Sequence, residues 1–195
     1  PYFGMLNNEV GYIMLNSFTE TASKEVTKAF KDLKANKGMK KLVFDLRGNG
    51  GGLLREAVNI VNLFVPKGQE VVSTKGKIAQ SKKVYRTLNE PLDEEIPVVI
   101  LIDGGSASAS EIVAGTLQDL DRGVVVGTNS FGKGLVQQTV DLSYNSKMKL
   151  TVAKYYTPSG RCIQRIDYSH KDKNGKFETV PDSLKAEFKT KNGRT

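Results

Sequence analysis

The alternation of apolar runs with amphipathic segments between residues 9 and 127 most restricts what this chain can fold into. Four apolar runs have the length of strands: 9–15, 41–46, 97–102 and 123–127. Three segments place apolar residues at helical spacing: 21–37, 53–64 and 112–120. Strands that alternate with helices form a largely parallel sheet covered by those helices. The sequence therefore predicts an α/β domain built on such a sheet.

Local signals add detail to this plan. Ser23 is expected to cap the first helix and Gly38 to end it. Alternating stretches predict three further strands, at 69–75, 135–142 and 149–156. The polar stretch 76–95 predicts an exposed, hairpin-like excursion. Beyond Asp167 the pattern fades, and no element is predicted.

These patterns divide the chain into two parts. Residues 1–166 form the expected core domain, and 167–195 form a basic C-terminal segment or part of an incomplete subdomain. Because the chain starts at Pro1 rather than at methionine, we expect it to be cut from a longer protein.

Composition excludes several classes of protein. The net charge is +8, but its basic excess is mixed with acids and lacks interleaved aromatic residues, which argues against a nucleic-acid site. No apolar run approaches the roughly 20 residues of a membrane helix. With one cysteine, Cys162, and one histidine, His170, neither an internal disulfide nor a metal site is expected.

The stretch 104–111, Gly-Gly-Ser-Ala-Ser-Ala-Ser-Glu, lies where a strand passes into a helix. Backbone N–H groups lack partners at such a corner, and small side chains let a substrate approach. Ser108 and Glu111 also fit a capping box, which on spacing alone is the simpler interpretation. The glycine-rich loop 47–52 is similarly either a tight turn or a set of bare N–H groups that face a ligand.

The shortage of histidine decides which base a catalytic serine could use. His170 lies in the polar tail, so a Ser-His-Asp triad is disfavoured, and Cys162 has no evident histidine partner. A lysine serves as a base if burial lowers its pKa from about 10.4 to about 7–8. Lys133 suits this role because it lies between two glycines in an otherwise uncharged loop.

The same loop, 127–134, nearly matches a nucleotide phosphate-binding loop. Gly134 stands where that motif needs a hydroxyl, and a strand rather than a helix is expected to follow. The nucleotide interpretation is therefore disfavoured.

Four motifs occur together in a recognisable order: Asp45-Leu-Arg-Gly-Asn-Gly-Gly-Gly52, Gly105-Ser-Ala-Ser-Ala-Ser-Glu111, Phe131-Gly-Lys-Gly134 with Val136-Gln137, and Tyr156-Thr-Pro-Ser-Gly-Arg161. In this order they resemble the carboxy-terminal processing peptidases, also called tail-specific proteases. The resemblance covers roughly residues 9–166 and implies a serine endopeptidase with a Ser–Lys dyad, on a layered crotonase/ClpP-like core with additional β-hairpins.

The resemblance also implies a role for individual residues. Ser108 matches the nucleophile, and Lys133 matches the general base. Gln137 matches the residue that helps to hold the lysine. The oxyanion hole matches the backbone N–H groups of Gly52 and Ala109, and Asp119 has a supporting role. A side chain at position 52 is expected to obstruct the substrate backbone.

The family implies no cofactor, protein or peptide substrates, a PDZ domain in the full-length chain and an exported, periplasmic location in bacteria; a homo-oligomer is compatible with it. The alternative is a peptide- or apolar-ligand-binding module on the same fold, without chemistry. The complete set of Ser108, Lys133 and Gln137 favours the enzyme.

Overall fold

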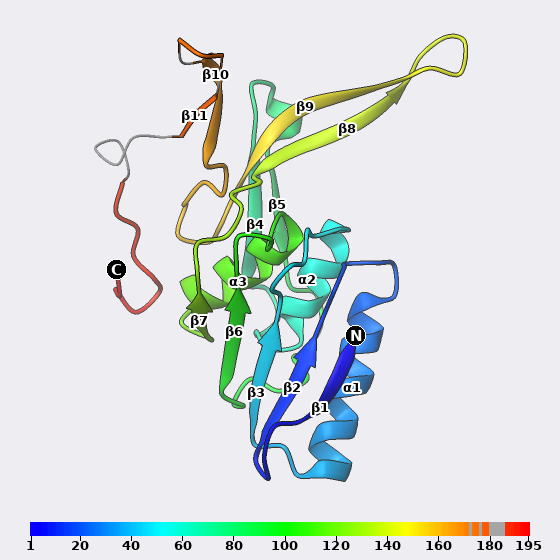
Figure 1. Cartoon of the computed structure of the whole chain (residues 1–195), viewed down its shortest axis with the longest axis vertical. Coiled ribbons are helices and arrows are strands. Elements are labelled where there is room, and N and C mark those ends of the chain that lie inside the picture. Colours follow the sequence, from blue (N-terminus) through cyan, green and yellow to red (C-terminus); the bar gives the residue numbers. More distant parts are fainter. Residues whose placement is uncertain (172, 176, 180–185) are drawn as a thin grey trace.

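A five-stranded sheet organises the first two thirds of the chain (Figure 1). The computed structural model describes residues 1–171, 173–175, 177–179 and 186–195. The strand order is β1 (Tyr2–Met5), β2 (Val10–Met14), β3 (Lys41–Asp45), β6 (Val98–Ile102) and β7 (Val124–Gly127). Strands β2, β3, β6 and β7 run parallel, and only β1 is antiparallel to its neighbour. The predicted, mostly parallel sheet is confirmed, whereas β1 was not expected.

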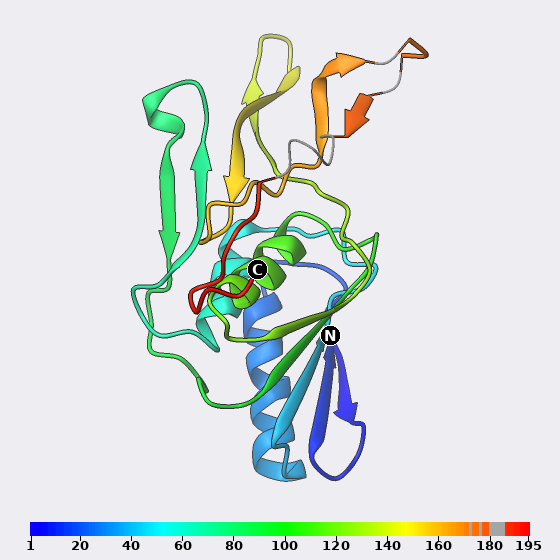
Figure 2. The same cartoon turned by 90° about the vertical axis from the view of Figure 1, so that its left-hand side faces the viewer.

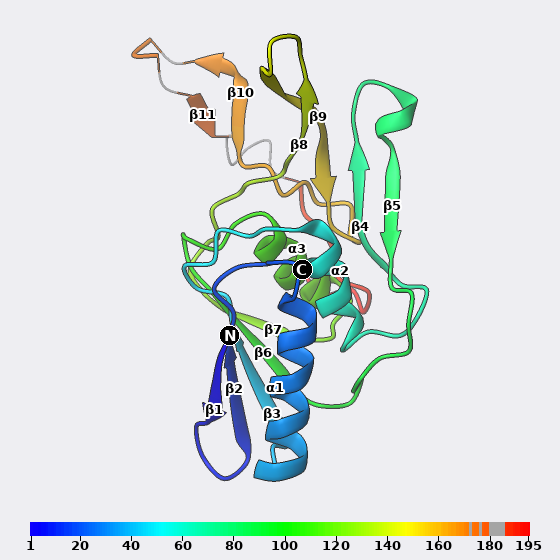
Figure 3. The same ribbon diagram turned by 90° about the vertical axis from the view of Figure 1, so that its right-hand side faces the viewer.

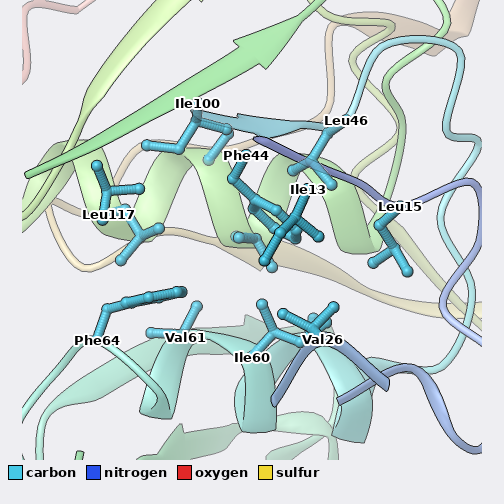
Figure 4. Close-up of a cluster of buried hydrophobic side chains, with 14 of the residues drawn as sticks. Ile13, Leu15, Val26, Phe44, Leu46, Ile60, Val61, Phe64, Ile100 and Leu117 are labelled. Carbon is cyan, nitrogen blue, oxygen red and sulfur yellow. The ribbon is translucent and has the colours of Figure 1, made fainter. Parts of the chain in front are cut away.

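Three helices cover one face of this sheet: α1 (Ala22–Lys37), α2 (Leu54–Asn62) and α3 (Ala109–Asp119) (Figures 1 and 3). Alternate strand residues such as Ile13, Phe44 and Ile100 are fully buried against them. Figure 4 shows these side chains facing Val61 and Phe64. On the opposite face Val124 remains about half exposed. The core thus lies between the sheet and a single layer of helices.

The first helix begins differently from the prediction. Thr21, not Ser23, is the residue before α1, and the Thr21 hydroxyl donates to Glu25. Ser23 lies inside the first turn, where its backbone N–H donates to the buried Glu56 carboxylate at 2.8 Å. Gly38 ends the helix in the left-handed conformation as expected, with a φ of 72°.

A second, antiparallel sheet stands beyond the carboxyl ends of the parallel strands (Figures 1 and 2). Its order is β5 (Lys83–Arg86), β4 (Glu70–Lys75), β9 (Lys147–Tyr156) and β8 (Leu135–Asp141), and a short 3₁₀ turn spans Ala79–Ser81. Both later strands are confirmed, whereas 76–95 contributes only one strand, β5, which forms a hairpin with β4 rather than a hairpin of its own. The hairpin of β10 (Ile166–Lys171) and β11 (Phe177–Thr179) was not predicted.

The C-terminal segment 167–195 lies partly outside the described residues. Its last described stretch contacts the end of α3, where the Lys191 N–H donates to the Asp119 carbonyl at 2.7 Å. None of the helices among the described residues combines the length and the hydropathy that a membrane span requires.

The topology explains why the sequence motifs meet. Strands β3, β6 and β7 are parallel neighbours, so the loops that follow them emerge at the same edge of the sheet. These loops are the glycine loop 46–53, the serine corner 103–108 and the lysine loop 128–134.

Candidate active site

The three serines of the corner occupy distinct environments. Ser106 and Ser110 are fully buried, and their hydroxyls donate to the carbonyls of Leu46 and Asn49 at 2.8 Å each. Both therefore tie the corner to the glycine loop. Ser108 alone among the three is half-buried rather than buried. The structure thus leaves one serine of the corner accessible, and it is the residue that matches the nucleophile.

Ser108 lies at a sharp bend between the corner and α3. Its φ of 56° and ψ of −111° are unusual for a residue with a side chain. It is the N-cap of α3 and forms the predicted capping box with Glu111. The Ser106 and Ser110 hydroxyls take no part in this cap, because both donate to the glycine loop. The N-cap position also places Ser108 at the positive end of the helix dipole.

The glycine loop packs directly against this bend. A Cβ atom on Gly51 would lie 2.6 Å from the Ala107 carbonyl oxygen and 2.9 Å from the Ser108 Cβ. The fully buried Asn49 holds the loop in place, because its amide donates to the Leu15 carbonyl at 2.6 Å and its side-chain oxygen accepts the Gly51 N–H. Sequence reasoning did not single out Asn49.

The two N–H groups matched to the oxyanion hole have no acceptor among the described residues. Gly52 is exposed, and Ala109 is the first residue of α3. A Cβ on Gly52 would lie 2.4 Å from the Phe18 carbonyl oxygen. Contact with the protein's own backbone is therefore a sufficient reason for glycine at this position, in addition to the obstruction of substrate that the sequence suggested.

The carboxylate of Glu111 joins the serine corner to the lysine loop. It accepts the backbone N–H of Ser108 at 2.7 Å and that of Lys133 at 2.8 Å. The Gly132 N–H, at 2.5 Å, and the Ser130 hydroxyl, at 2.7 Å, complete its contacts. The residue is only 6 % exposed. One buried side chain thus fixes both backbones, a role that the sequence indicated only as capping.

The N–H groups of the lysine loop are therefore already hydrogen-bonded within the protein. The N–H groups of Gly132 and Lys133 bind Glu111, and that of Gly134 binds the Gln164 side chain at 2.8 Å. The strand β8 follows, as the sequence predicted. An internal carboxylate therefore occupies the position that a phosphate would need.

The Lys133 side chain is exposed, whereas the sequence argument required it to be buried. Lys133 lines an open groove that Gln137 also lines. Within the described part of the chain, the Lys133 ammonium and the Ser108 hydroxyl form no hydrogen bond with one another. The structure joins their backbones through Glu111 without a hydrogen bond between the two side chains.

Asp119 acts at the far end of α3. Its buried carboxylate accepts the Ser159 N–H at 3.0 Å and a guanidinium N–H of Arg161 at 2.9 Å. The turn that contains Ser159 leads to residues 163–165, which run beside the lysine loop, with the Arg165 N–H on the Gly132 carbonyl at 3.1 Å. Asp119 thus fixes the turn from which this stretch continues. The side chain of His170 lies outside the described residues.

Asp45 anchors the start of the glycine loop. Its carboxylate accepts the Tyr12 hydroxyl and a guanidinium N–H of Arg47, each at 2.6 Å. Burial acts to raise the pKa of Asp45, but the hydrogen bonds from Arg47 and Tyr12 outweigh it and hold this pKa below its usual value. Asp45 therefore stays ionised and keeps the guanidinium at the entrance to the loop.

Comparison with known proteins agrees with this arrangement. The model of "Peptidase family S41" matches residues 9–170. The chain belongs to peptidase family S41. A carboxy-terminal-processing protease of Bartonella bacilliformis is 44 % identical over 83 % of this chain and 38 % of its own length. A chloroplastic C-terminal processing peptidase of Tetradesmus obliquus is 38 % identical over 85 % of this chain and 35 % of its own.

A solved structure, a photosystem II D1 C-terminal processing protease, shares this fold with a TM-score of 0.72. The two sequences are 38 % identical, and the match covers 80 % of this chain and 39 % of the solved chain. The resemblance inferred from the four motifs and the layered α/β fold are both confirmed. The chain spans less than two fifths of the length of these S41 relatives, and the role of each site residue stays a prediction.

The close approach of the glycine loop gives a first test. Gly51→Ala should lower the free energy of unfolding by about 2–4 kcal/mol, because the new methyl group meets backbone atoms and φ is 98°. Gly68→Ala is the matched control, since φ there is 86° but no atom lies within 4 Å. It should cost only about 1–2 kcal/mol in urea unfolding. Equal losses would contradict the tight contact at Gly51.

Glu111 gives a second test. In Glu111→Gln an NH₂ group replaces one acceptor oxygen among donors, so we expect a loss of about 2–4 kcal/mol in the free energy of unfolding. Peptidase activity of the full-length protein should fall about 100-fold, because the serine and lysine backbones lose their common support. The exposed Glu95→Gln should change stability by less than about 0.5 kcal/mol. Normal activity in Glu111→Gln would contradict this role.

Proposed function

We propose that this chain is the catalytic core of a serine endopeptidase that cuts protein substrates near their C-termini. Ser108 is its nucleophile and Lys133 its general base. The observation that carries the proposal is the Glu111 carboxylate, which joins the backbones of these two residues in a family S41 chain. The open N–H groups of Gly52 and Ala109, beside an accessible serine, support it further.

The reaction is an acyl transfer. Neutral Lys133 takes the proton of the Ser108 hydroxyl as its oxygen attacks the carbonyl carbon of the peptide bond. The N–H groups of Gly52 and Ala109 stabilise the oxyanion that forms, a contribution of about 3–4 kcal/mol per donor in other enzymes. The lysine then gives its proton to the departing amine. Water hydrolyses the ester, which releases a carboxylate product and restores the serine.

Because Lys133 is exposed, its ammonium has to lose its contact with water before it can act as a base. A cover over the groove, by the substrate or by another part of the full-length protein, would remove water from the ammonium and favour its neutral form. The family resemblance supports a PDZ domain as part of that cover and an exported, periplasmic location in bacteria. Gln137, in the same groove, would then hold the lysine toward Ser108.

Removal of either reacting group tests the assignment. Ser108→Ala and Lys133→Ala should each abolish cleavage of an unfolded test protein by the full-length enzyme. Loss of the Ser108 cap should also cost about 1 kcal/mol of stability, which leaves the protein folded. Lys149→Ala is the control, because Lys149 is an exposed lysine in β9, and this variant should remain active. Cleavage at the wild-type level by either site variant would refute the assignment. Tight peptide binding by an inactive wild type would favour the alternative of a binding module.

The pH dependence tests the identity of the base. A lysine accepts a proton only in its neutral form, so kcat should rise between about pH 6 and 9 when chemistry limits turnover. Single-turnover cleavage measured across this range reports the step directly. A rate that does not change with pH would argue against a lysine base.

A further inference from the structure

A groove of about 710 Å³ runs from Lys133 along the second sheet. Its walls are mostly apolar and come from Phe131, Leu135, Ile166 and Tyr168. One side is the β8–β9 hairpin, and the other is the start of β10. The groove therefore begins at the proposed base and continues away from it between two strands that do not pair with one another.

The hairpin presents a free strand edge to this groove. β8 is the last strand in the order β5-β4-β9-β8, and residues 137–141 are exposed. An edge strand offers unpaired N–H and C=O groups, to which an extended peptide can add as a further strand. Such pairing recognises a backbone of any sequence, and alternate side chains would meet the apolar walls.

Two lysines lie opposite one another on adjacent strands of the same sheet. Lys154, which lines the groove, is directly opposite Lys75 on β4 and Leu135 on β8. Like charges opposite one another on adjacent strands repel. Within the described residues neither lysine forms an ion pair, and Lys75 instead lies 4.5 Å from the ring centre of Tyr156. Asp167 also lines the groove and has a partner of its own, but among the described residues it forms no ion pair with Lys154. An anion beside Lys154 would relieve this repulsion.

We propose that this groove receives the C-terminal end of the substrate, extended along β8, with its terminal carboxylate paired to Lys154. The inference rests on the proposed function, in which Lys133 is neutral, so that Lys154 is the cation left among the groove residues. Lys154 is opposite Leu135, two residues beyond Lys133. At roughly 3.3 Å per extended residue, this spacing suits a short tail after the cut bond.

The test compares one apolar peptide with a free C-terminal carboxylate against the same peptide as its amide. Binding is measured by fluorescence anisotropy on the full-length Ser108→Ala protein, so that the result does not depend on turnover. The carboxylate form should bind more tightly, and Lys154→Met should reduce that preference about threefold to fivefold by weakening the carboxylate form alone. A preference for the carboxylate form that arises elsewhere in the protein is the same with and without Lys154→Met, so it does not affect the comparison.

Two further variants sharpen the comparison. Lys154→Arg keeps the charge and should keep the preference. Lys149→Met removes an exposed lysine of the same strand that does not line the groove, and it should leave the preference unchanged. An unchanged preference in Lys154→Met would overturn the proposal. Loss of proteolysis in the wild type with this binding pattern intact would instead overturn the proposed function alone.

Discussion

The buried carboxylate of Glu111 is the contact on which the rest of the site depends. Ionised carboxylates accept hydrogen bonds but donate none, and all four groups around this one are donors. Charge-assisted bonds of this kind are stronger than neutral ones. They hold together loops that follow two different strands of the sheet. One side chain thus fixes the backbones of both residues to which we assign catalysis, the serine and the lysine.

Helix α3 extends this support to the opposite end of the site. Its first turn carries Glu111 and its last turn carries Asp119, and both side chains are buried. Asp119 fixes the turn around Ser159, which leads to the strand-like stretch beside the lysine loop. The loop is therefore held by its N–H groups from one side and by a neighbouring chain segment from the other. Glycines flank Lys133 because this segment comes close: a Cβ on Gly132 would lie 2.4 Å from the Arg165 Cβ.

Periodicity was enough to predict the parallel sheet and its three helices, because burial on one face imposes a regular pattern on the sequence. It missed β1, whose first two residues are exposed, and the β10–β11 hairpin, which begins where the apolar pattern of the sequence fades. The motifs selected Ser108 and Lys133 but not the network around them. Asn49 and Glu111 act through contacts with residues distant in sequence, and no local spacing encodes such contacts. The exposure of Lys133 was likewise invisible, since it depends on what stands across the groove.

The lysine loop combines a fixed backbone with a free side chain. Three successive N–H groups are held, whereas the ammonium of Lys133 lies in open solvent. Exposed side chains change rotamer within picoseconds to nanoseconds, while loops rearrange far more slowly. In the mechanism proposed above, the part of the dyad that is free to move is therefore the flexible methylene chain of Lys133. In an enzyme of this design, the base can respond to filling of the groove by changing rotamer while the backbone that carries it stays in place.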